Sequence, residues 1–246
     1  MCWRMRRIME GMELSTDSKI AEAYEAVVMG RRSIRGYKPD AVPMALVREV
    51  IALAMRAPSS LNTQPWNFTV VSGAALDAIR QGNTERNLAG VPSSREFTAS
   101  EGYEGAHRER QIGVAKQLFA AMDIARDDKV KRKEWVLRGF RQFDAPVSII
   151  VTYDKILKGN DIAPFDCGAV INALVNAAWS RGLGCVINSQ GIMQSPVVRE
   201  HAQIPDDQLI MMCVAMGWPD DSFPANAVVS ERKPIEKAVT FIGFDE

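Results

Sequence analysis

Residues 58–72, PSSLNTQPWNFTVVS, join a polar turn to a strand. The first nine residues hold hydroxyl and amide side chains between two prolines, which fixes the backbone direction and presents neutral hydrogen-bond donors and acceptors. Residues 66–72 alternate and are rich in β-branched and aromatic side chains, which predicts a strand. The turn suits recognition of the edge of a heterocycle, although by itself it is equally compatible with an ordinary polar turn.

The rest of the chain predicts an α+β layer fold. Three more segments, roughly 147–153, 185–188 and 209–216, read as strands, so we expect four strands in a central sheet. Helical spacing or capping residues predict helices at 17–30, from Pro43 to before Pro58, at 74–81, at 166–181, and a short one opened by Ser195 and Pro196. These helices have unequal lengths and follow no regular βαβ alternation, which favours an α+β fold.

A charged excursion interrupts this pattern between residues 82 and 143, centred on 84–140. Its amphipathic spacing predicts two surface helices. Their apolar positions either cover a pocket or pack on the domain's own core; they are Ile112, Leu118, Phe119, Met122 and Trp135. No repeat or low-complexity tract divides the chain, so we expect a single domain at 17–246, preceded by an N-terminal arm at 1–16.

The composition of the 246-residue chain excludes several classes of function. Lys plus Arg equals Asp plus Glu at 30 each, so no overall field attracts nucleic acid or an anionic membrane, and the basic run at 129–133 reads as a solvated helix face. Because the chain has only two histidines and four widely spaced cysteines, we do not expect it to bind a metal. We see no stretch near the roughly 18 apolar residues of a membrane span. These features predict a soluble protein of the reducing cytoplasm.

A second cluster, Arg31, Arg32, Ser33 and Arg35, follows the helix predicted at 17–30. Three guanidiniums and a hydroxyl within five residues can grip phosphate oxygens through paired, charge-assisted hydrogen bonds. Taken alone, the cluster is also compatible with a solvated basic turn.

Together the two clusters resemble the nitroreductase superfamily of FMN enzymes. The family's R-x-S-x-R/K pattern stands at 31–35 and its P-S-S-x-N-x-Q-P-W pattern at 58–66. Further along, RGLGC at 181–185, MGWP at 216–219 and SERKP at 230–234 look like the family's later motifs. The resemblance runs in order from about residue 23 to 235, and only the excursion diverges.

This resemblance implies an FMN site shared between two subunits. It implies that Arg31, Ser33 and Arg232 hold the phosphate and ribityl chain, with Arg32 beside them, and that Arg35 lies at the N1 and C2 carbonyl edge, where a cation stabilises reduced flavin. The run at 188–191 aligns beside N5. The full set expected to bind the cofactor also includes the turn contributed by the partner subunit: Pro58, Ser59, Ser60, Asn62, Gln64, Asn188, Ser189, Gln190 and Gly191.

Two positions depart from the family pattern. Ser230 stands where compact relatives have lysine, which shifts the expected phosphate contact toward Arg232 and Arg32. The family's acidic turn is shortened to Pro164-Phe165-Asp166, where Asp166 is expected only to cap the following helix. We assign no catalytic role to Asp166, or to any other side chain, because the flavin performs the chemistry.

The implied activity is two-electron, ping-pong transfer of hydride from NADH or NADPH to a small nitroaromatic acceptor by a homodimer. Flavin, quinone or enone reduction and reductive dehalogenation are alternatives on the same scaffold, and a non-catalytic FMN-binding protein is another. Aromatic side chains in and near the excursion are expected to stack on the acceptor and so determine which acceptor is preferred. The candidates are Phe97, Tyr103, Phe119, Trp135 and Phe140.

Overall fold

The computed structural model describes residues 18–97 and 102–244, so the predicted arm at 1–16 lies outside the described residues. The chain forms two compact units, 1–31 and 32–246. The described part of the first unit is helix α2 (Ser18–Gly30), followed by Arg31. This helix was expected from its apolar spacing, yet none of its residues is buried.

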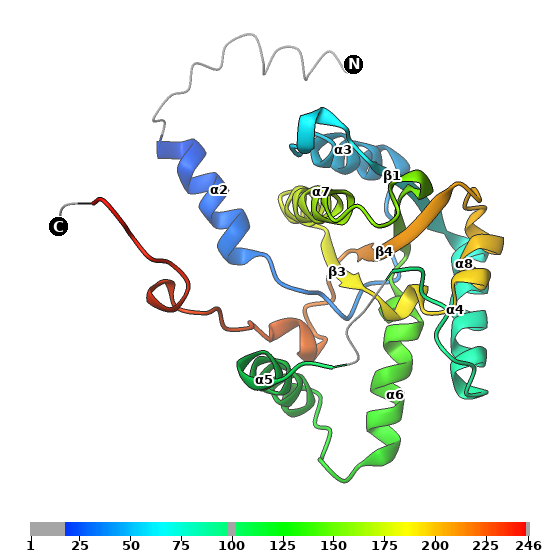
Figure 1. Cartoon of the computed structure of the whole chain (residues 1–246). Coiled ribbons are helices and arrows are strands. Elements are labelled where there is room, and N and C mark those ends of the chain that lie inside the picture. Colours follow the sequence, from blue (N-terminus) through cyan, green and yellow to red (C-terminus); the bar gives the residue numbers. More distant parts are fainter. Residues whose placement is uncertain (1–17, 98–101, 245–246) are drawn as a thin grey trace. The chain divides into compact units, whose positions relative to one another are not determined.

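The second unit is built on a four-stranded sheet (Figure 1). Its strands are β1 (Trp66–Ser72), β2 (Val147–Asp154), β3 (Gly184–Asn188) and β4 (Gln208–Gly217), in the order β1-β2-β4-β3 with every neighbouring pair antiparallel. All four predicted strands are therefore confirmed, with ends within one residue of the expected positions. The α+β assignment is confirmed as well.

Helices cover both faces of this sheet. On one face α3 (Met44–Ala54) and α7 (Ile162–Trp179) pack against each other and form the main core with β2 and β4. On the other face α4 (Gly73–Leu88) and α8 (Ser195–Ala202) enclose a second core. Ile149 faces the first core and Ile150 the second, which is why β2 is an unbroken apolar run instead of an alternating one.

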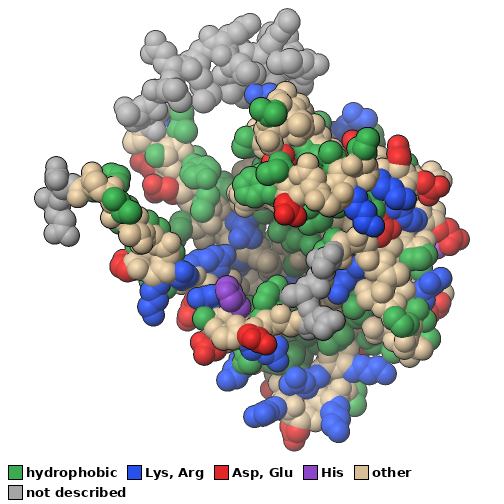
Figure 2. Space-filling model, viewed as in Figure 1, with side chains coloured by type: hydrophobic (Ala, Val, Ile, Leu, Met, Phe, Trp, Pro, Cys, Tyr) green, Lys and Arg blue, Asp and Glu red, His purple; other side chains and the backbone are tan. Residues whose placement is uncertain are grey.

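The excursion contains the two expected helices, α5 (Gly105–Ala121) and α6 (Lys129–Phe140). The basic run that opens α6 lies on the surface, and Figure 2 shows Lys and Arg side chains gathered at the lower end of this face. The other end of α6 is buried through Leu137, Gly139 and Phe140, so α6 is a surface helix over only part of its length. Six short 3-10 turns complete the fold: η1 (Ser60–Asn62), η2 (Gln142–Asp144), η3 (Lys155–Leu157), η4 (Gln190–Ile192), η5 (Pro224–Ala227) and η6 (Ile235–Lys237).

Two helix boundaries differ from the sequence expectations. Helix α4 continues to Leu88 instead of ending near 81, because Asn83 is buried against the rest of the fold and holds the added turn in place. Helix α7 begins at Ile162, so Asp166 lies inside the helix and the expectation that it caps the helix is wrong.

By length and composition, α7 is long and apolar enough to cross a membrane, the single such helix among the described residues. Its buried side chains, including Cys167, Val170 and Leu174, lie in the core between α3 and the sheet. It is therefore the central helix of the fold.

The packing of α7 gives a stability prediction. Leu174 has no exposed surface and lies in the main core. Leu174→Ala should lower the free energy of unfolding by about 2–5 kcal/mol, through lost burial and a cavity. Urea denaturation would measure this, with Ile156→Ala, at a side chain 91% exposed, as the control expected to change little. Equal effects of the two substitutions would contradict the assigned core.

Candidate active site

From Arg32 onward, the arginine cluster is an extended segment beside β3. The Ile34 amide donates to the Cys185 carbonyl (3.0 Å), and Ser33 forms a parallel bridge with Cys185. Ile34 is buried and leans over Gly184, where an added Cβ would lie only 2.5 Å from Ile34 Cγ1. The segment is therefore anchored by its apolar residue, while Ser33 and Arg35 on either side remain partly exposed.

One buried amide fixes the backbone of this segment. Asn226 Oδ1 accepts from the amides of Arg35 (2.7 Å) and Gly36 (3.1 Å), and its Nδ2 donates to the carbonyls of Gly36 (2.7 Å) and Asp220 (2.9 Å). Asn226 is 3% exposed, so these four bonds form away from water. Arg32 Nε also donates to the Asn226 carbonyl (2.5 Å).

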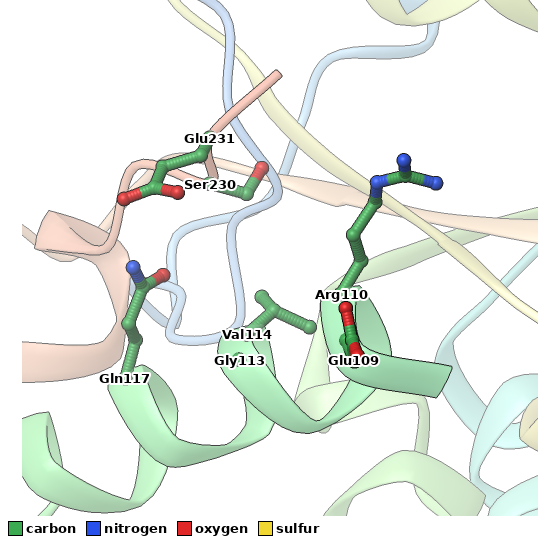
Figure 3. A pocket seen from close by; sticks show the side chains of 7 residues that line it. All are labelled: Glu109, Arg110, Gly113, Val114, Gln117, Ser230 and Glu231. Atoms are coloured by element: carbon green, nitrogen blue, oxygen red, sulfur yellow. The ribbon is translucent and has the colours of Figure 1, made fainter. Parts of the chain in front are cut away.

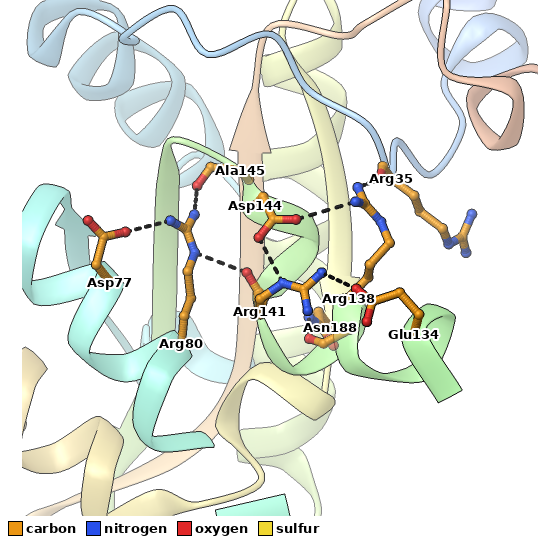
Figure 4. Close-up of polar contacts among 10 residues, drawn as sticks. Arg35, Asp77, Arg80, Glu134, Arg138, Arg141, Asp144, Ala145 and Asn188 are labelled. Atoms are coloured by element: carbon orange, nitrogen blue, oxygen red, sulfur yellow. Dashed lines mark hydrogen bonds and ion pairs between the residues drawn. The ribbon is translucent and has the colours of Figure 1, made fainter. Parts of the chain in front are cut away.

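Two guanidiniums share this region. Arg35 Nη1 donates to the Ser33 carbonyl (3.3 Å), and Arg138 Nη2 donates to the Arg35 carbonyl (3.1 Å; Figure 4). Burial lowers the pKa of both Arg35 and Arg138, so both cations are held partly out of water. Such a site favours a ligand edge that is electron-rich or gains negative charge.

The loop after β3 is held by amide side chains on several sides. Asn188 Oδ1 accepts from the amides of Gln190 (2.9 Å) and Gly191 (3.3 Å), and its Nδ2 donates to the Gly139 carbonyl (2.7 Å). From α4, Asn83 Nδ2 donates to the Gly191 carbonyl (2.6 Å). An added Cβ on Gly191 would come within 2.7 Å of Cys213 Sγ, so this loop requires glycine. Ser189 at its start is partly exposed.

The turn at 58–66 has a strained backbone. Leu61, Asn62 and Gln64 have φ values of 49°, 59° and 46°, a left-handed region that costs non-glycine residues free energy. The Ser59 hydroxyl accepts from the Gln64 amide (3.0 Å), and the buried Asp166 carboxylate accepts from the Ser60 amide (3.1 Å). Asp166 thus ties this turn to α7, which is the role it plays in place of capping.

Side chains of this turn point to solvent within the single chain. Pro58, Ser60, Asn62 and Gln64 are exposed, and Leu61 is 96% exposed. Pro65 and Trp66 at the end of the turn are buried, whereas the side chains from Pro58 to Gln64 are largely exposed, which fits a surface that contacts something else.

The remaining phosphate candidates lie in separate parts of the chain. Arg31 ends the first unit, whereas Arg32 belongs to the second, where its guanidinium lies 5.4 Å from the centre of the Trp179 ring. Arg232 lies in the exposed C-terminal segment and donates to the Ser230 hydroxyl (2.8 Å). Ser230, the residue that departs from the family's lysine, therefore contacts the arginine expected to grip phosphate.

A shallow cavity of about 280 Å³ lies between α5 and this C-terminal segment (Figure 3). Its lining side chains include Arg110 and Gln117 from α5 and Glu231 from the C-terminal segment. A second cavity, about 370 Å³, includes Phe97, Tyr153 and Met211 in its lining.

The five aromatic acceptor candidates are not brought together. Tyr103 is 55% exposed, Phe119 lies 4.6 Å beneath the Arg132 guanidinium, and Trp135 packs against Phe143 with ring centres 6.3 Å apart. Phe97 lines the second cavity. Phe140 is 2% exposed, so both faces of its ring are covered and we assign it to the core.

Sequence reasoning missed three side chains that shape the site: Asn83, Arg138 and Asn226. Asn83 fell at the start of a segment read as surface, and Arg138 looked like one charge among many on an amphipathic helix. Asn226 lies about 190 residues from the turn it holds, within PANA, and no local pattern marks it. No group of three His, Cys, Asp or Glu side chains able to hold a metal occurs among the described residues.

The fold and the site together define an α+β protein with a cationic, amide-lined ligand site. The residues fit a flavin: partly buried guanidiniums suit the electron-rich N1 and C2 carbonyl edge, and a fixed amide loop suits hydrogen bonding to a ring nitrogen. Arg138 Nε is also buried without a hydrogen-bond partner in the described structure.

The chain belongs to the nitroreductase family, whose model matches residues 28–218. It is 34% identical over 220 residues to nitrobenzene nitroreductase of Ectopseudomonas oleovorans, covering 88% of this chain and 95% of the relative. It is 32% identical to 4-nitrobenzoate reductase of a Nocardioides strain, covering 92% of each. Among solved structures, the FMN-dependent nitroreductase NfnB from Mycobacterium smegmatis in complex with NADPH matches with a TM-score of 0.84 at 27% identity, covering 91% of this chain and 99% of that one.

The role of Asn226 gives a second prediction. Asn226→Ala should leave the amides of Arg35 and Gly36 and the Gly36 carbonyl without their side-chain partner, at a cost of about 2–4 kcal/mol in the free energy of unfolding. Chemical denaturation measures the change. The control is Asn67→Ala, which removes an exposed bond to Asp154 and should cost under about 1 kcal/mol. A loss for Asn226→Ala as small as the control's would show that the segment does not depend on it.

Proposed function

We propose that the chain is an FMN-dependent NAD(P)H oxidoreductase that reduces nitroaromatic compounds. The observation that carries the proposal is the segment from Ser33 to Gly36, with Arg35 partly buried and its backbone fixed by Asn226. The family membership and the names of the relatives, which are reductases of nitrobenzene and 4-nitrobenzoate, support the acceptor class.

The chain's residues have distinct parts in holding the cofactor. Within the second unit, Ser33, Arg32 and Arg232 would hold the phosphate and ribityl chain, and Arg35 would bind the N1 and C2 carbonyl edge. Arg31 remains a candidate from the sequence alone. Bound FMN supplies the hydride chemistry between the reduced nicotinamide and the acceptor. The loop of Asn188, Ser189, Gln190 and Gly191 presents a donor at N5, and the buried amides around it keep that donor in place. We assign no side chain as a general acid.

The site is completed by a second copy of the chain. Pro58, Ser59, Ser60, Asn62 and Gln64 contact the flavin held by the partner, which is consistent with a strained turn whose side chains point to solvent. Apolar side chains exposed on the single chain support a homodimer, since such surface is normally covered. They include Tyr24 and Met29 of α2, Leu61, and Phe241, Ile242 and Phe244 of the C-terminal segment.

Residues 17–246 act as one functional domain in this proposal, although 1–31 and 32–246 are separate compact units. The cytoplasm suits the chain because Cys167 and Cys213 are buried thiols and burial raises the pKa of Cys167 to about 12. They pack as small apolar groups, as the sequence suggested.

Acceptor preference resides in the excursion, through Tyr103, Phe119 and Trp135, each of which keeps part of its ring accessible. Aromatic stacking on a flat acceptor contributes about 0.5–1.5 kcal/mol per good pair.

A cofactor test distinguishes this proposal from a non-catalytic FMN-binding protein. Purified protein reconstituted with FMN should be yellow, dimeric and close to one flavin per chain. Anaerobic stopped-flow should show bleaching of the yellow flavin colour by NADH or NADPH, followed by recovery of the colour on adding nitrobenzene. Protein that takes up no FMN and stays monomeric would overturn the proposal, and yellow protein that neither nicotinamide bleaches would favour a non-catalytic role.

An acceptor panel separates the proposed activity from its alternatives on the same scaffold. We expect kcat/KM to be highest for nitrobenzene and nitrobenzoate, and lower for quinones, enones, halophenols and free flavin. Replacing residues 105–137 with the matching segment of another family member keeps Asn83 and Arg138, and should change the ranking of acceptors without loss of bound FMN. An unchanged ranking would place acceptor choice outside residues 105–137 and contradict the roles of Phe119 and Trp135.

A further inference from the structure

The C-terminal turn of α6 contacts both segments assigned to the flavin. Arg138 donates to the Arg35 carbonyl (3.1 Å), and the next residue, Gly139, accepts from Asn188 Nδ2 (2.7 Å). An added Cβ on Gly139 would collide with the Gln190 side chain, so the helix backbone lies directly against the loop. One turn of helix therefore joins the two edges of the proposed flavin site.

Arg138 is fixed in a way that makes this contact rigid. Its guanidinium lies 4.7 Å from the centre of the Phe223 ring and pairs with Asp144 at 3.4 Å (Figure 4). Phe223 lies three residues before Asn226 and packs where Gly36 leaves room, so the same C-terminal stretch supports both Arg138 and the backbone of Arg35. Arginine can hold such an arrangement because its planar group donates in several fixed directions and stacks on a ring.

Arg35 itself has few fixed partners. Its Nη1 donates to the Ser33 carbonyl (3.3 Å), and no carboxylate pairs with it among residues 18–97 and 102–244. With the Arg35 amide held by Asn226, the bond from Arg138 fixes the other side of the same residue. The direction in which the Arg35 side chain leaves the backbone thus depends on Arg138.

We propose that Arg138 is a positioning residue that holds Arg35 against the pyrimidine edge of the flavin and so sets the relative affinity of the protein for oxidised and reduced FMN. This inference rests on the proposed function. It connects the excursion, which carries acceptor choice, to the cofactor through a single side chain. Reduced flavin carries extra negative charge at that edge, so it depends on correct placement of Arg35 more than oxidised flavin does.

Arg141 provides a matched control. It lies three residues further on and pairs with the same carboxylate, Asp144 (3.1 Å), and with Glu134 (2.7 Å), and in the described part of the chain it forms no hydrogen bond with Arg35. Removing Arg141 deletes one positive charge and one bond to Asp144, as removing Arg138 does. A difference between the two variants therefore isolates the contact with Arg35.

The test compares Arg138→Met, Arg138→Lys and Arg141→Met in the full-length, FMN-loaded dimer. The difference between the midpoint potentials of bound and free FMN gives the affinity ratio for the two redox states, and the Kd for oxidised FMN then gives each affinity. In both Arg138 variants we expect the affinity for reduced FMN, relative to that for oxidised FMN, to fall about tenfold. This change lowers the two-electron midpoint potential by about 30 mV. Arg138→Lys should not preserve the wild-type ratio, because an ammonium is a point charge without the forked geometry of a guanidinium. Arg141→Met should keep the wild-type ratio.

Three results would overturn the inference. The first is a wild-type affinity ratio in both Arg138 variants, and the second is an equal change of this ratio in Arg141→Met. The third is a wild-type ratio in Arg138→Lys with a reduced ratio only in Arg138→Met, which would mean that charge alone matters. Circular dichroism verifies folding of each variant, and Arg138→Lys alone decides the matter if Arg138→Met does not fold. Failure of the wild-type protein to bind FMN is a separate outcome that overturns the proposed function and this inference with it.

Discussion

The four hydrogen bonds of the Asn226 side chain are the constraint on which the site depends. The segment from Ser33 to Gly36 pairs with β3 only at Cys185, so its other buried amides and carbonyls need partners, and buried polar groups left unpaired are costly. The Asn226 side chain has two donor hydrogens and one oxygen that accepts two bonds. It pairs with the amides of Arg35 and Gly36 and with the Gly36 carbonyl. The segment therefore keeps an irregular shape without loss of stability, and the side chain of Arg35 remains available for a ligand.

The same solution recurs around the site. Asn83 and Asn188 hold the loop that ends at Gly191, and Asp166 holds the strained turn at Ser60. In each case a buried polar side chain on a helix or strand fixes an irregular segment that approaches the ligand. The antiparallel sheet and its two helical layers supply rigid positions for these side chains, which suits a cofactor whose chemistry depends on electrostatic surroundings that are set before it binds.

The family assignment and the four strands were accessible from the sequence because their signals are local. Residues 31–35 and 58–66 carry fixed motifs, and the strands at 66–72, 147–154 and 209–216 are short apolar or alternating runs bounded by turns. Helix ends were less accessible. The extension of α4 to Leu88 depends on burial of Asn83, and the early start of α7 depends on a tertiary environment that no capping pattern announces.

By itself, the sequence determined the fold class and the motif residues, since both follow from residue types and short spacings. Only the tertiary structure decided that Phe140 is core, that Asp166 supports a turn, and that Asn226 and Arg138 converge on Arg35 from 191 and 103 residues away. Such contacts depend on how distant elements pack. A hydrogen bond between residues so far apart produces no sequence pattern, because the sequence does not distinguish a buried, bonded asparagine or arginine from an exposed one.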